Sequence, residues 1–252
     1  MIKLFVVSII SLSLVFSSAW AQVAIINDQQ YVSEDGTFHI VGEIENNSSV
    51  PLNQVVVTAT FYDINKKTLD TVSTDSILET IMPGKKGPFD LFFINNVVSQ
   101  IYQYSLNIKY KPTDYKTESL EILSSNAKRD MLDNFIISGT VTNHDQKTAN
   151  TIVVIATLYD KDGKVVATSK TYTQPEYLKA GGITPFLVSI FDKSQSLKAT
   201  DYSLMVESEE YAAVPEFPLG SGIILALSVI AYVIFTETKI FTTVPFRVKS
   251  SK

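Results

Sequence analysis

The stretch Phe38–Asn46 (FHIVGEIEN) recurs further along the chain as Phe135–Asn143 (FIISGTVTN). The motif ATFYD, which ends at Asp63, likewise recurs as ATLYD, which ends at Asp160. One constant shift of about 97 residues aligns both pairs without a gap, and that period is the size of a small domain rather than of a solenoid repeat. The sequence therefore predicts two tandem copies of one domain.

Each copy has the composition of β-strands. Val55–Tyr62 and its counterpart Ile152–Tyr159 are rich in β-branched and aromatic residues, which favour strands. An aspartate follows each run and begins a segment typical of a hairpin turn. Short strands with turns at this spacing predict an all-β fold, with one β-sandwich over residues 22–115 and another over residues 116–212.

Alternate residues of these runs predict the buried face of each sandwich. The predicted core positions are Val55, Val57, Ala59 and Phe61 in the first copy, and Ile152, Val154, Ala156 and Leu158 in the second. Gly42 and Gly139 interrupt a strand pattern at equivalent positions, and a bulge or a close backbone approach is the usual cause.

The N-terminus has the pattern of a secretory signal peptide. Lys3 precedes an apolar run, and Ala19-Trp20-Ala21 fits the A-x-A cleavage pattern, so residues 1–21 are predicted to be removed after Ala21. An uncleaved N-terminal anchor is the alternative, although the apolar run is short for a bilayer span.

A second apolar run, Leu219–Phe235, lies near the C-terminus. At a rise of ~1.5 Å per residue it would extend about 25 Å, which approaches the thickness of a hydrocarbon core. We therefore expect a transmembrane helix over residues 219–236, in contact with membrane lipid, and a basic cytoplasmic tail over residues 237–252. The predicted location is the cell membrane, with a single span and an extracellular body. A buried helix of a soluble domain is the alternative interpretation.

Charge and cysteine content exclude several classes of protein. The chain has no cysteine, so a disulfide scaffold is excluded and each fold must rest on hydrophobic packing. The formal net charge is -5, although the predicted cytoplasmic tail is basic. The remaining body is more acidic still, which argues against nucleic acid as a partner.

Residues suited to catalysis or metal binding are scarce. The two histidines, His39 and His144, occupy positions that are not equivalent in the two copies, and a metal site would need several such ligands in one domain. Glu43 and Glu45 share one strand face, which we expect to be solvated; a glycosidase pair would require a groove around them. The segment Asp160–Gly163 is predicted to be a turn rather than a calcium loop. The sequence thus predicts a protein that is not an enzyme, with no catalytic residue, no metal site and no cofactor.

The segment Asn46-Asn47-Ser48-Ser49 contains two overlapping N-glycosylation sequons, on Asn46 and Asn47. A plain turn is equally compatible with the same four residues. The second copy has no sequon at the equivalent position, so glycosylation is not a general property of the repeated fold.

The repeated motifs carry a resemblance to a known family. Gly-x-hydrophobic-x-Asn, followed by a β-rich run that ends in Leu158-Tyr159-Asp160, resembles the FxLYD domain, which implies an immunoglobulin-like sandwich in an exported prokaryotic protein. Residues 213–218 form a linker that contains the sorting-like motif Pro215-Glu216-Phe217-Pro218, which resembles the PEF-type C-terminal tails of archaeal surface proteins. That resemblance implies an archaeal envelope protein whose tail is a sorting signal.

These features predict a non-catalytic, membrane-anchored surface protein that acts in display, adhesion or envelope scaffolding and binds a protein partner at the cell surface. The alternative is an accessory subunit of a membrane enzyme or transporter, docked through the single transmembrane helix. The small residues Gly220, Gly222, Ala226 and Ser228 of that segment would allow another helix to approach. A hydrolase is a third hypothesis, and it would need a groove lined by several carboxylates.

Overall fold

The computed structural model describes residues 22–94 and 97–216. The predicted signal peptide with Ala19 and Ala21, the predicted transmembrane and cytoplasmic segments, and Phe217 and Pro218 of the sorting-like motif lie outside these ranges. Within the described ranges, no helix combines the length and apolar character that a bilayer span requires. Residues up to Val214 form one compact unit, and a second unit begins at Pro215.

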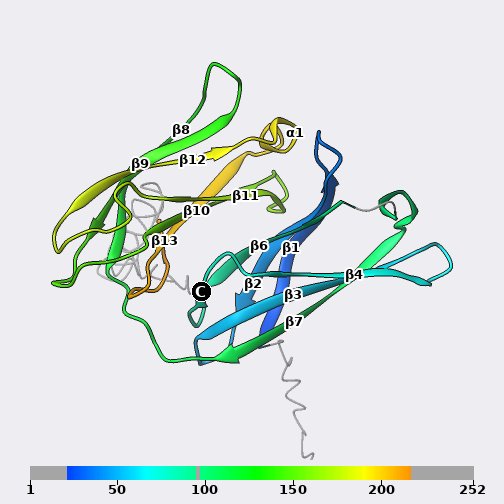
Figure 1. The fold of residues 1–252 in the computed structure, drawn as a ribbon, viewed down its shortest axis with the longest axis horizontal. Helices are drawn as coiled ribbons and strands as arrows, with labels where there is room; N and C mark the ends of the chain where they lie inside the picture. Colours follow the sequence, from blue (N-terminus) through cyan, green and yellow to red (C-terminus); the bar gives the residue numbers. More distant parts are fainter. Residues whose placement is uncertain (1–21, 95–96, 217–252) are drawn as a thin grey trace, which may run out of the picture. The chain divides into compact units, whose positions relative to one another are not determined.

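The described part of the chain is almost entirely β-structure (Figure 1). The strands of the first repeat are β1 (Val23–Val32), β2 (Phe38–Asn46), β3 (Leu52–Tyr62), β4 (Thr68–Asp75), β5 (Thr80–Ile81), β6 (Lys86–Phe93) and β7 (Gln103–Pro112). The strands that follow are β8 (Leu120–Arg129), β9 (Phe135–Asn143), β10 (Val153–Tyr159), β11 (Val165–Tyr172), β12 (Ile183–Ile190), β13 (Asp201–Glu207) and β14 (Val214–Pro215). The helical segments are the 3₁₀ turn η1 (Val98–Gln100) and the one-turn helix α1 (Lys193–Ser196).

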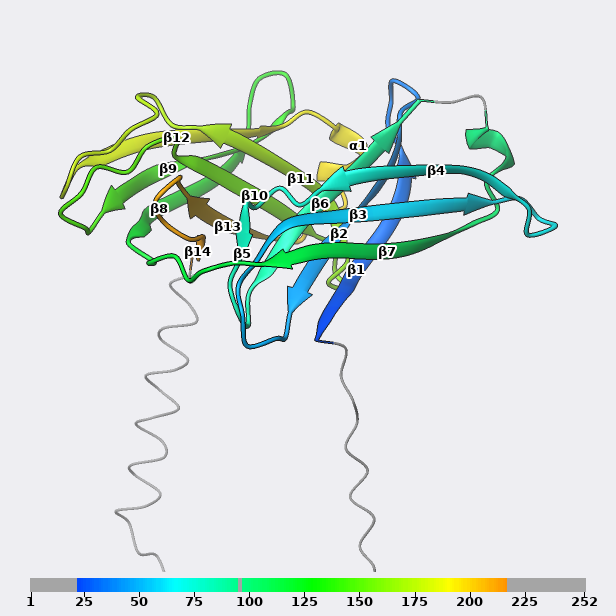
Figure 2. The same cartoon turned by 60° about the horizontal axis from the view of Figure 1, so that its bottom comes forward.

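The strands form four antiparallel sheets, two in each repeat. In the first repeat, strands β1-β2-β6 form one sheet, and β3 pairs with β4, β5 and β7 in the other. In the second repeat, strands β12-β9-β8 form one sheet and β11-β10-β13 lie side by side in the other, as two layers (Figure 2). The repeats thus build the same arrangement, and the all-β class predicted from the sequence is confirmed.

Each repeat has its own hydrophobic core between its two sheets. All eight residues that strand alternation predicts to be buried are at most 2% exposed, which confirms that prediction. Strand β3 directs Val55, Val57, Ala59 and Phe61 into the first core, while Val154, Ala156 and Leu158 of β10 lie in the second, with Ile152 just before the strand. Burial of these side chains from water is the main source of stability for a chain that has no cysteine.

A phenylalanine explains the glycine that both repeats carry in mid-strand. Gly42 of β2 pairs with Phe89 of β6, and Gly139 of β9 pairs with Phe186 of β12. A Cβ atom added at Gly42 would meet the Phe89 ring at 2.8 Å, and one at Gly139 would meet the Phe186 ring at 2.7 Å. In both copies a ring therefore occupies the space that the absent side chain leaves. At Gly139 the added Cβ atom would also lie 2.0 Å from the Ser124 carbonyl oxygen, which is the close backbone approach predicted from the sequence.

An asparagine ends both β2 and β9, and its side chain forms hydrogen bonds to two loops in each repeat. Asn46 Nδ2 donates to the carbonyl oxygens of Val50 and Ile81, at 2.9 Å each. Asn143 Nδ2 donates in the same way to Lys147 and Leu178, at 2.7 and 2.9 Å. Both asparagines are fully buried. Each buried amide therefore has both of its N–H groups satisfied and ties two loop carbonyls to the end of its strand.

The repeated aspartate after β3 and β10 forms a turn, as predicted. Asp63 Oδ1 accepts hydrogen bonds from the backbone N–H groups of Asn65 and Lys67, each at 2.8 Å. Asp160 Oδ1 accepts equivalent bonds from the second and fourth residues after it, at 3.0 and 2.9 Å. The carboxylate is thus occupied by the turn itself, and the Asp160–Gly163 segment is a hairpin loop.

Candidate functional site

The outer face of sheet β1-β2-β6 is covered by the second repeat. Strand β11 contacts β1, β2 and β6. Val41 on this face is completely buried, and Ile155 of β10 and Met205 of β13 join the hydrophobic cluster of the first repeat. The two repeats therefore share a packed interface, formed by the outer faces of two sheets.

A carboxylate, that of Glu43, is buried in this interface. Glu43 is only 1% exposed, so the expectation that Glu43 and Glu45 form a solvated strand face is wrong for Glu43. Its carboxylate accepts a hydrogen bond from Tyr159 Oη at 2.6 Å and one from Asn27 Nδ2 at 3.0 Å, and Lys86 Nζ lies 3.5 Å away. Burial raises the pKa of Tyr159, and the charge of Glu43 raises it further, so the phenol remains a donor. The buried charge is thus paired and hydrogen-bonded, as its position requires.

A second carboxylate, that of Glu207, is buried where the two repeats meet. Glu207 of β13 is 6% exposed, and its Oε1 accepts a hydrogen bond from the backbone N–H of Glu79 at 3.0 Å. Burial is the main cause that raises the pKa of Glu207 to about 7, and the charge of Glu79 adds to it. Lys116 opposes the shift, and it forms an ion pair with Glu79 at 2.9 Å. Protonation of Glu207 near neutral pH therefore changes the charge inside the contact between the repeats.

His39 faces a hollow of about 360 Å³ beside this interface. Its Nδ1 lies 2.9 Å from Asp90 Oδ1, and its ring stacks on Tyr31 with 4.6 Å between the centroids. Burial, followed by the charges of Asp90, Asp192 and Asp35, raises the pKa of Tyr31. In the part of the chain that the structure describes, no hydroxyl group bonds to the other ring nitrogen of His39. The contact with Asp90 and the stack on Tyr31 therefore fix the orientation of the His39 ring.

The other histidine lies in a different setting. His144 Nε2 bonds to Glu121 Oε2 on the surface of the second repeat, and both side chains are more than half exposed. Among residues 22–94 and 97–216, no group of three or more His, Asp or Glu side chains is arranged to hold a metal ion.

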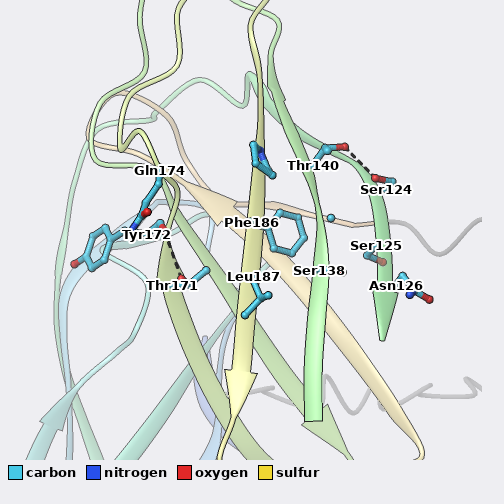
Figure 3. Close-up of a pocket in the computed structure, with 12 residues that line it drawn as sticks. Ser124, Ser125, Asn126, Ser138, Thr140, Thr171, Tyr172, Gln174, Phe186 and Leu187 are labelled. Carbon is cyan, nitrogen blue, oxygen red and sulfur yellow. Dashed lines mark hydrogen bonds between the residues drawn. The ribbon is translucent and has the colours of Figure 1, made fainter. Parts of the chain in front are cut away.

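The equivalent sheet face of the second repeat is open. Strands β8, β9 and β12 and the end of β11 surround a hollow of about 850 Å³ (Figure 3). Hydroxyl and amide groups line it together with apolar side chains, and none of its lining residues is charged: Ser124, Ser125, Asn126, Ser138, Gly139, Thr140, Thr171, Tyr172, Gln174, Pro185, Phe186 and Leu187. The Ser124 and Thr140 hydroxyls are hydrogen-bonded at 2.9 Å. This neutral hollow lies on the face that the first repeat uses for its contact with the second, and it is the candidate site.

The two repeats have different residues at equivalent positions of this sheet face. Val41 and Glu43, which are buried in the first repeat, correspond to Ser138 and Thr140 in the second. Asp90 corresponds to Leu187, which is 53% exposed. The sequence repeat contains these differences, but strand alternation alone does not indicate which of the two equivalent faces is covered.

The two sequons differ in the accessibility of their asparagines. Asn46 is fully buried, and its Nδ2 is occupied by two loop carbonyls. Asn47 is exposed, and its Nδ2 donates to Glu45 Oε2 at 2.8 Å. A glycan on Asn46 would replace one of the two Nδ2 hydrogens that these carbonyls accept and would have to fit at a buried site, whereas Asn47 is already exposed. Of the sorting-like motif, Pro215 and Glu216 are described, and Pro215 ends β14.

No protein-family model matches the sequence, and no curated protein is similar to it in sequence. Among solved structures, an exo-chitosanase from Amycolatopsis orientalis aligns with a TM-score of 0.27 and 11% identity, over 77% of this chain and 26% of the chitosanase. Red sea bream transglutaminase aligns with a TM-score of 0.25 and 10% identity, over 78% of this chain and 31% of that protein. The chain spans about a quarter to a third of the length of these proteins, and similarities this low say nothing about its activity.

Proposed function

We propose that the chain is a non-catalytic surface protein of an archaeal envelope, anchored in the membrane through residues 219–236. Its body is two tandem immunoglobulin-like sandwiches of the FxLYD type, and it acts in display, adhesion or envelope scaffolding. The signal peptide and the apolar C-terminal segment, both predicted from the sequence, support the location.

The observation that carries the proposal is the contrast between the two equivalent sheet faces. The first repeat uses its face to hold the second repeat, with Val41 and Glu43 buried in the contact. In the second repeat, the same face carries a neutral hollow among the residues that the structure describes. One repeat therefore supports the other, which is the organisation expected of a protein whose second repeat presents a binding surface.

Fractionation of native cells followed by mass spectrometry of the intact protein tests this function. We expect the protein in the membrane fraction, resistant to alkaline carbonate and released by detergent, with a mature N-terminus at Gln22. Recovery from the soluble cytosolic fraction, with residues 1–21 still attached, would refute the proposal. The same mass would show whether the chain is cut near Phe217 and whether Asn47 carries a glycan.

A further inference from the structure

We propose that the open face of sheet β12-β9-β8 binds a neutral oligosaccharide. This inference rests on the proposed function only in that the face must be exposed outside the cell. The hollow, with a volume of about 850 Å³, is large enough for a small ligand. Because no charged residue lines it, an anionic or cationic ligand would lose hydration there without gaining a partner of opposite charge. The lining therefore selects for a neutral ligand.

The polar and apolar groups are arranged in separate rows. Ser138 and Thr140 lie two residues apart on β9 and so share one sheet face, with Ser124 and Asn126 paired beside them on β8. On the other side of β9, Pro185 and Leu187 lie opposite Thr140 and Ser138. A strip of hydroxyl and amide groups thus runs alongside a strip of apolar carbon, from the same sheet (Figure 3).

This pairing matches the chemistry of a sugar ring. A pyranose carries hydroxyl groups around its edge and C–H groups on its faces, so it can bond to one strip and pack on the other. The apolar strip continues to Ile183, which is 62% exposed, and the four-residue separation of Ile183 and Leu187 spans about 13 Å at strand spacing. That length suits several linked rings rather than a single one. Tyr172 on the rim, 46% exposed, adds an aromatic surface.

The first repeat argues against a protein sheet as the occupant. There the covered face fixes its partner through Val41, which is buried, and through Glu43, which accepts the Tyr159 hydroxyl. The open face has Ser138 and Thr140 at these positions, so it lacks both the buried apolar contact and the buried acceptor. The outer face of β3, which would be the matching surface of another copy, presents Thr58 and Thr60 where the second repeat presents Ile155 and Thr157.

The test uses the full chain in lipid nanodiscs, free of sugar-based detergent. Isothermal titration calorimetry with maltohexaose, cellohexaose, mannohexaose and N-acetylated chitohexaose supplies four neutral probes. We expect at least one probe to bind at millimolar concentration or below. Thr140→Val removes one hydroxyl at nearly constant volume, and Leu187→Asp introduces the residue of the first repeat into the apolar strip. Each is expected to weaken binding about tenfold, the loss of roughly one good hydrogen bond or contact.

Thr58→Val is the matched control. Thr58 Oγ1 bonds to Ser73 Oγ at 2.8 Å on an exposed strand face, much as Thr140 bonds to Ser124 in the candidate site. Its substitution should leave the affinity unchanged, and circular dichroism of all three variants should match that of the parent. Failure of all four probes to bind at millimolar concentration would overturn the proposal, and so would equal affinity in the parent and the folded Thr140→Val and Leu187→Asp variants.

Self-association of the chain that Leu187→Asp abolishes would also overturn the proposal, because it would show that the face docks protein. These outcomes are separate from the location of the protein in the cell, since binding is measured with purified material. A cytosolic location would refute the proposed function while leaving a positive titration intact.

Discussion

Replacement of Glu207 by glutamine should remove the loss of folding stability that its ionisation causes in the contact between the repeats at high pH. Glu207 is a residue of β13, and its carboxyl group is buried. The pKa of this group in the folded chain is about 7, whereas its ordinary value is 4.5. Between these two values the folded chain binds more protons than the unfolded chain. Stability associated with this group is therefore fully present below pH 4.5 and is lost as the pH rises through 7.

The size of the effect follows from the shift. Each pKa unit corresponds to about 1.4 kcal/mol, so the ionised carboxylate lowers the free energy of unfolding by about 3 kcal/mol above pH 8. Glu207→Gln keeps an oxygen that can accept the Glu79 N–H and carries no charge. The variant should be more stable than the parent at pH 8, by up to about 3 kcal/mol, and should match it near pH 4.

Urea unfolding of the full chain, followed by circular dichroism at several pH values, measures this difference. Glu176→Gln serves as the control, because Glu176 is an exposed carboxylate of the same repeat. The reasoning is refuted if Glu207→Gln shows the same pH profile as the parent, or if it is less stable than the parent at pH 8.

Two further substitutions test the features shared by the repeats. Gly139→Ala places a Cβ atom 2.0 Å from the Ser124 carbonyl oxygen and 2.7 Å from the Phe186 ring, so thermal unfolding should show a loss of about 1–3 kcal/mol; an unchanged melting temperature would contradict this packing. Asn143→Ala removes a buried amide together with its hydrogen bonds to the carbonyl oxygens of Lys147 and Leu178, and it should cost about 2 kcal/mol in urea unfolding. The exposed Asn150, whose Nδ2 bonds to Glu210, provides a matched control, and an equal loss from Asn150→Ala would argue against a special role for the buried amide.

The core of each repeat could be predicted from the sequence because two independent signals agree. Strand alternation selects one face of Val55–Tyr62, and the second copy repeats the same choice with different apolar residues. The turn at Asp63 was likewise predictable, because an aspartate side chain can accept the backbone N–H groups of a turn.

The contact between the repeats could not be predicted in the same way. His39, Val41, Glu43 and Glu45 alternate with core residues of β2, a pattern that is typical of a solvated strand face. Burial of Glu43 depends on Tyr159, which lies in the other repeat, and alternation within one strand carries no information about such a partner. The open hollow was missed for the same reason, because it is defined by the absence of that covering sheet.

The most direct test of the central claim uses the absence of cysteine from the chain. Lys161→Cys places a single thiol on the exposed hairpin after β10, and Ser250→Cys places one in the predicted cytoplasmic tail. In intact cells, a membrane-impermeant maleimide should label the Lys161→Cys protein, and the Ser250→Cys protein should react only after the membrane is permeabilised. Labelling of Lys161→Cys only after permeabilisation would contradict a body displayed on the cell surface.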